Sequence, residues 1–230
     1  KMLDLLGLKG LPDHKIRIEA TGHDSMREYE QYKFQLIREG EMPVPCILIM
    51  PSRANADSPV ELRLQEEGKG TYLSEYANFA AALTEGKILL LADLRGFGET
   101  TDPAFYTDAK YWNREYRNAM ISMHIGRPIM GQRVVDILTL LDFCSEHELL
   151  KGHPVKVFAN GIYGPVAIHA AYLDERINSV EIKHSVKTWK EYIERPMQWD
   201  MYSNVLYGAL KYYDLPDLIR LSNRSIRFAD

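Results

Sequence analysis

The sequence predicts an α/β protein with a doubly wound, mostly parallel sheet and an antiparallel hairpin at its N-terminus. Three observations predict this fold class: alternating strand patterns open the chain, a continuous apolar run follows the first helical pattern, and helix and strand patterns then alternate. With 230 residues, of which 46% are hydrophobic and 26% charged, the chain is long enough to bury a sizeable core. We therefore expect a single domain over residues 1–230.

Charge and cysteine content narrow the classes of partner. The 28 basic against 32 acidic side chains give a net charge of −4 without a Lys/Arg block, so we expect no nucleic-acid partner. No apolar run reaches the roughly 18 residues that a membrane span needs, so we expect no membrane partner. Cys46 and Cys144 lie in apolar stretches outside any metal-ligand spacing. We expect two buried free thiols, a pattern that leaves the compartment unknown.

The beginning of the chain has strand patterns. Residues 14–20 and 29–38 alternate apolar and polar residues, and this two-residue period predicts two strands. Residues 43–51 and 60–65 continue the series of predicted strands, with a loop at 55–59 between them. We expect the first two to form a hairpin whose turn is Gly22–Ser25.

The middle of the chain changes period. Residues 73–84 have helical spacing with Gly86 as a cap, and the apolar run at 87–93 is typical of a strand buried on both faces. Residues 96–127 keep no period and are interpreted as an irregular excursion. The clearest amphipathic helix is predicted at 129–150.

The last third alternates strands and helices. We predict a strand at 154–159, a small-residue helix at 165–174 and a strand at 177–183. Residues 189–213 are helix-like and aromatic, and 224–230 is predicted to be a final strand. The parallel strands place their carboxyl ends at one edge of the sheet, where functional residues are expected.

Two of these strand ends carry a resemblance to a known family. The strand at 87–93 runs into a match to D-x-R-G-x-G-x-[ST], at Asp93, Arg95, Gly96, Gly98 and Thr100. The strand at 154–159 runs into Asn160–Gly164 and a small-residue helix. Their order resembles the α/β-hydrolase fold and is most similar to the acetyl xylan esterase and cephalosporin deacetylase branch of the carbohydrate esterases. The resemblance spans roughly residues 44–230 and implies a chain that ends before the last strand of that fold.

The resemblance places Gly161 at the nucleophile position. In the family this position is the centre of G-x-S-x-G, a sharp strand-to-helix turn that holds its central residue at positive φ. Glycine adopts that conformation freely, whereas serine is strained there, so glycine relieves strain and removes the attacking oxygen. Tyr163 stands where the turn needs a small residue, and its ring is expected to crowd the space above the turn.

The catalytic base and acid of the family have only weak matches in this sequence. His184, at a strand end, and Asp230 are the weak candidates for base and acid, and Asp230 is either a remnant acid or simply the last residue. His169 lies in a predicted helix and is expected in the core. Glu66 and Glu67 are adjacent and project apart, so they do not indicate a paired acid and base. No metal-ligand pattern is present, and we expect no metal or cofactor.

Residues at the strand ends are expected to line a ligand pocket that persists without the nucleophile. The segment at 67–71 occupies the place of the family's oxyanion loop, although a plain turn is expected there. Arg95 is expected to be mainly structural, pairing with Asp93 or Glu99 or bracing the elbow. Beside His184, the pocket is expected to include Lys69, Arg95, Asn160, Ile162 and Tyr163.

Three functional hypotheses follow. The first is a noncatalytic or accessory domain derived from a carbohydrate esterase and attached to a companion esterase domain. The second is a carboxylic-ester hydrolase, such as a carbohydrate deacetylase, that uses an atypical nucleophile or an activated water near Gly161. The third is an interaction module whose pocket is filled by Tyr163.

These hypotheses share expectations about ligands and origin. The expected ligand is a carbohydrate or small ester, and the aromatic stretches at 106–116 and 189–213 would cover the pocket or contact a sugar. Membership of the carbohydrate esterases would imply a bacterial protein that is secreted or periplasmic.

Overall fold

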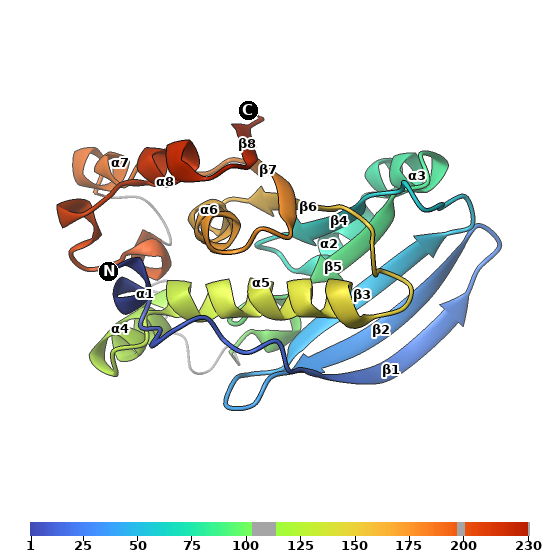
Figure 1. Ribbon diagram of the computed structural model, residues 1–230, viewed down its shortest axis with the longest axis horizontal. Helices are drawn as coiled ribbons and strands as arrows, with labels where there is room; N and C mark the ends of the chain where they lie inside the picture. The colour runs from blue at the N-terminus through green and yellow to red at the C-terminus, as the bar shows by residue number, and fades with distance from the viewer. Residues whose placement is uncertain (103–113, 197–200, 230) are drawn as a thin grey trace.

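The fold is built around one mixed sheet (Figure 1). A computed structural model describes residues 1–102, 114–196 and 201–229. In these residues the sheet has eight strands in the order β1-β2-β3-β5-β4-β6-β7-β8. The strands are β1 (Arg17–Ser25), β2 (Tyr29–Ile37), β3 (Val44–Pro51), β4 (Val60–Leu64), β5 (Ile88–Ala92), β6 (Val155–Asn160), β7 (Ile177–Lys183) and β8 (Ser225–Phe228).

The sheet changes from antiparallel to parallel at β5. The pairs β1–β2, β2–β3 and β3–β5 are antiparallel, whereas β5–β4, β4–β6, β6–β7 and β7–β8 are parallel. The predicted fold class, a mostly parallel sheet with an antiparallel N-terminal hairpin, is confirmed. Because β4 lies between β5 and β6, the carboxyl ends of β4 and β6 become neighbours: Gln65 and Asn160, which follow or end these strands, are 95 residues apart in the chain.

The predicted hairpin turn is wrong. Gly22–Ser25 continues β1, with Gly22 opposite Lys33 and Ser25 opposite Glu30, and the turn follows at Met26. The register shifts between Ala20 and Gly22, so the glycine accompanies a bulge within the strand and does not end it.

Helices cover the sheet on two faces, and each face has its own core. α5 and α6 lie side by side on one face (Figure 1), where most of the buried apolar residues gather. On the other face, Tyr72 and Phe79 pack against Ile49, Leu89 and Leu91. The helices are α1 (Met2–Leu5), α2 (Lys69–Ser74), α3 (Tyr76–Thr84), α4 (Arg114–His124), α5 (Ile129–Glu146), α6 (Tyr163–Leu173), α7 (Lys190–Glu194) and α8 (Leu215–Leu221).

Several helix predictions need correction. The expected turn at 67–71 and helix at 73–84 are instead α2 and α3, separated at Glu75, whose ψ of 73° is not helical. The expected irregular excursion contains α4. The helix-like region at 189–213 contains only short helical segments in its described part, and α8 follows it with an Asp214 cap and a proline in its first turn.

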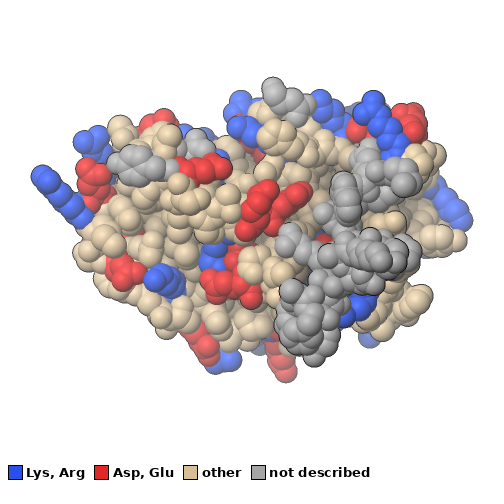
Figure 2. Space-filling view, turned by 180° about the vertical axis from the view of Figure 1, so that it is seen from behind, with Lys and Arg blue, Asp and Glu red and all other residues tan. Residues whose placement is uncertain are grey.

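Some sequence expectations fall outside the described residues. These are the aromatic side chains at 105–112 and Asp230. His169 is fully buried in α6 as expected, and Cys46 and Cys144 are buried free thiols. No described helix has the length and apolar character needed to cross a membrane. Basic and acidic side chains are interspersed over the visible described surface in Figure 2, without a continuous field of either sign.

Candidate functional site

A sharp strand-to-helix turn lies at the carboxyl end of β6. β6 ends at Asn160, Gly161 has a φ of +58°, and α6 begins at Tyr163 after Ile162. The Gly161 N–H donates to the Lys183 carbonyl at 2.9 Å, which ties the turn to the end of β7. Gly161 thus occupies the conformation that glycine adopts freely and other residues adopt at a cost.

The carboxylate of Glu66 fills the space beside this turn. A Cβ atom added to Gly161 would overlap the Glu66 carboxylate, far inside van der Waals contact. The Ile162 N–H donates a hydrogen bond to the same carboxylate. The backbone donor that follows the turn therefore already binds a negatively charged group.

The position of Glu66 follows from the sheet order. Glu66 comes two residues after β4, and β4 pairs in parallel with β6. At the same edge the Asn160 side-chain amide donates to Gln65 Oε1 at 3.2 Å. Sequence reasoning missed both Gln65 and Glu66 as residues of this site, although their place after a predicted strand was an available signal.

His184 completes a polar chain across three strand ends. Its Nδ1 lies 3.1 Å from the side-chain oxygen of Asn160. His184 also has a φ of +51°, the one positive φ among described non-glycine residues. Such a conformation is strained for a histidine, so the surrounding structure must hold it.

Lys69 is buried in an ion-pair cluster. Its Nζ lies 2.6 Å from Asp93 Oδ2 and 2.6 Å from Glu99 Oε1, and its backbone N–H donates to Asp93 Oδ1 at 2.6 Å. A Cβ atom on Gly98 would overlap the Asp93 carboxylate. This part of the matched sequence motif thus serves to join the start of α2 to the end of β5.

Arg95 pairs with other partners than the sequence suggested. Its Nε donates to Asp136 Oδ2 at 2.9 Å, and its guanidinium also reaches Gln132 at 2.7 Å and Glu41 at 3.0 Å. The expected pairing with Asp93 or Glu99 is wrong, because Lys69 occupies both carboxylates. Burial alone would lower the pKa of Arg95, but the hydrogen bonds and charges of Asp136 and Glu41 raise it above its ordinary value.

Tyr163 lies in the core beneath the turn. Its side chain is fully buried, its ring meets the edge of Phe97 at a centroid distance of 5.5 Å, and its hydroxyl has no hydrogen-bond partner among the described residues. Burial raises the pKa of this hydroxyl. The expectation that Tyr163 crowds the space above the turn is corrected, since Glu66 occupies that space.

A small cleft of about 240 Å³ lies next to the turn. Of the expected cleft residues, Asn160 and His184 line it, together with Gln65 and Lys183, which the sequence did not single out. Its described lining does not include the other expected pocket residues, which are Lys69, Arg95, Ile162 and Tyr163; these four are buried. Within the described ranges no cluster of three or more His, Cys, Asp or Glu side chains could hold a metal ion.

Comparison with known proteins supports the fold. No protein-family model matches the chain, and no curated protein sequence is significantly similar to it. A Bacteroides fragilis protein named as a candidate acetyl xylan esterase superposes with a TM-score of 0.82 at 14% identity, over 100% of this chain and 65% of its own length. Acetyl xylan esterase 1 of Thermoanaerobacterium has a TM-score of 0.67 at 14% identity, over 93% of this chain and 72% of its own. A glucuronoyl esterase of Solibacter usitatus has a TM-score of 0.66 at 12% identity, over 97% of this chain and 69% of its own length.

These likenesses define the class of fold. The chain has an α/β-hydrolase-like fold whose structural neighbours include carbohydrate esterases. The chain spans less than two thirds of the length of the Bacteroides fragilis protein.

Proposed function

We propose that this chain is a noncatalytic α/β-hydrolase-like domain in which Gly161 replaces the nucleophilic serine of a carbohydrate esterase. One observation carries the proposal: the Glu66 carboxylate occupies the turn at Gly161 and accepts the Ile162 N–H. Ester hydrolysis at such a turn needs a nucleophile and free N–H donors for the oxyanion. A carboxylate there removes a donor and places negative charge where negative charge would have to develop.

The surroundings of His184 support the same proposal. A histidine that acts as a base is usually oriented by a carboxylate, which also stabilises the imidazolium. His184 instead hydrogen-bonds the neutral amide of Asn160, and its side chain is exposed. Under this proposal the domain acts as an accessory to a companion esterase domain in a secreted or periplasmic bacterial protein.

Hydrolysis of a small aryl acetate tests the proposal. The purified chain should release product no faster than a heat-denatured control, and Gly161→Ser should not gain turnover, because no base is placed to activate the new hydroxyl. A turnover that Gly161→Ala or Glu66→Ala abolishes would contradict the proposal. It would favour the alternative hypothesis, an ester hydrolase in which an activated water attacks.

A further inference from the structure

One face of the sheet is polar over its last strands. The buried residues of β6 and β7 are apolar, such as Val157 and Ile182, and pack into the core with α5 and α6. The other residues of these strands are partly or fully exposed, among them Lys156 and Lys183. By contrast, all five residues of β5 are buried.

This alternation is unusual for parallel strands. Strands of a parallel sheet are generally covered by helices on both faces and are then apolar throughout, as β5 is. The polar alternation in β4, β6, β7 and β8 therefore indicates a face that meets water or a polar ligand and not an apolar helix.

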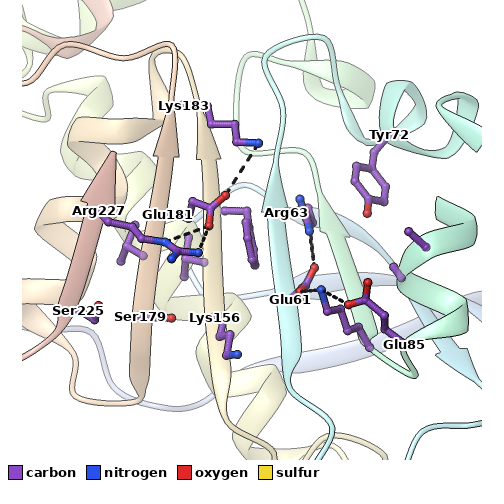
Figure 3. A pocket seen from close by; sticks show the side chains of 16 residues that line it. Glu61, Arg63, Tyr72, Glu85, Lys156, Ser179, Glu181, Lys183, Ser225 and Arg227 are labelled. Carbon is purple, nitrogen blue, oxygen red and sulfur yellow. Dashed lines mark hydrogen bonds and ion pairs between the residues drawn. The ribbon is translucent and has the colours of Figure 1, made fainter. Parts of the chain in front are cut away.

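The polar face forms a cleft of about 570 Å³ (Figure 3). Four neighbouring strands each contribute one cationic side chain to it: Arg63 from β4, Lys156 from β6, Lys183 from β7 and Arg227 from β8. Figure 3 shows these side chains on the same side of the sheet, with polar Ser179 and Ser225 in one row with Lys156, below Arg227.

The carboxylates of the cleft are already neutralised. Glu61 accepts from Arg63 at 3.1 Å and lies 3.3 Å from Lys87. Glu181 accepts from Arg227 at 3.2 Å and lies 3.9 Å from Lys183. Altogether five cationic and three carboxylate side chains line the cleft, which leaves an excess of two positive charges in a chain of net charge −4.

From this arrangement we infer that the open polar face of the sheet binds an anionic oligosaccharide that carries uronate carboxylates. Guanidinium and ammonium groups bind carboxylates through charge-assisted hydrogen bonds, and the serine hydroxyls suit sugar hydroxyls. The strand register spreads the cations over the face: Arg63 and Arg227 lie at one level, Lys156 lies two residues before it along the strands, and Lys183 lies two residues after it. Uronate carboxylates on different units of one oligosaccharide can thus meet cations at different levels of the face.

An acidic polypeptide fits this face less well. Protein interfaces are depleted in Lys, Glu and Ser at their centres, and these residues dominate the cleft.

Calorimetric titration with an α-1,4-linked galacturonic acid tetramer tests the inference. The tetramer should bind the chain, more weakly as salt rises, and neutral xylotetraose should not bind. The double variant Lys156→Gln/Arg227→Gln should weaken binding at least about tenfold, the loss expected for charge-assisted hydrogen bonds. The control Lys151→Gln/Lys190→Gln removes two exposed lysines outside the cleft and should change affinity less than twofold.

Three results would overturn the inference: no binding of the tetramer, equal losses in the two double variants, or equal binding of xylotetraose. Tighter binding of hexaglutamate with the same dependence on Lys156 and Arg227 would also overturn it and would assign the face to an acidic polypeptide. Because this assay measures only the sheet face, it can fail while the proposal for Gly161 stands, and the reverse also holds.

Discussion

Replacing Gly161 by alanine tests the crowding at the turn. The left-handed conformation at φ +58° costs a non-glycine residue about 1–2 kcal/mol. The new methyl group would also displace the Glu66 carboxylate, which loses its hydrogen bond from Ile162. A hydrogen bond to a charged group contributes about 1.5–3 kcal/mol, and we take the lower end because Glu66 is partly exposed. Gly161→Ala should therefore lower the free energy of unfolding by about 3 kcal/mol.

A double-mutant cycle separates the two contributions. In a Glu66→Ala background the carboxylate is absent, so Gly161→Ala should cost only the backbone strain, about 1.5 kcal/mol. Urea denaturation of the wild type, both single variants and the double variant measures the difference. Glu67→Ala, which removes the adjacent exposed carboxylate, is the matched control background and should leave the cost at about 3 kcal/mol. Equal costs in the wild-type and Glu66→Ala backgrounds, within about 0.5 kcal/mol, would refute the placement of Glu66.

Three further predictions concern the core. Tyr163→Phe removes a buried hydroxyl without a described partner, so urea denaturation should show unchanged stability or a gain of about 1 kcal/mol, and a clear loss would reveal a partner. Burial lowers the pKa of His169 from 6.5 to about 4, so between these values the unfolded state binds a proton that the folded state does not. The free energy of unfolding should therefore fall by about 2 kcal/mol from pH 7 to pH 5. His169→Gln should remove that fall. Burial raises the pKa of Cys46 and raises that of Cys144 to about 12, so neither thiol should react with iodoacetamide at pH 8 before the protein unfolds, as mass spectrometry would show.

Much of the fold could be predicted from the sequence, because local patterns of apolar and polar residues determine where strands and helices form. The apolar run that became β5 predicted a strand buried on both faces, and the order of strands and helices predicted the parallel sheet. The sharp turn after β6 was also predictable, because Gly161 follows the predicted strand and glycine readily adopts the positive φ that such a turn requires.

The side chains that contact one another at the site could not be predicted in the same way. Glu66 meets Gly161 only because β4 inserts beside β6, a pairing between segments far apart in the chain. Likewise, the partner of Arg95 is Asp136 on α5, whereas the nearby carboxylates Asp93 and Glu99 bind Lys69. In both cases long-range packing chose between several chemically equivalent partners.

The amide proton of Ile162 gives the most direct test of the central claim, that the Glu66 carboxylate occupies the turn. In the NMR spectrum of the wild type this proton should resonate far downfield, as expected of a donor to a carboxylate, and Glu66→Ala should move it upfield. Glu67→Ala should leave it in place. An Ile162 resonance that does not respond to Glu66→Ala would contradict the claim and leave the donor free to bind an oxyanion.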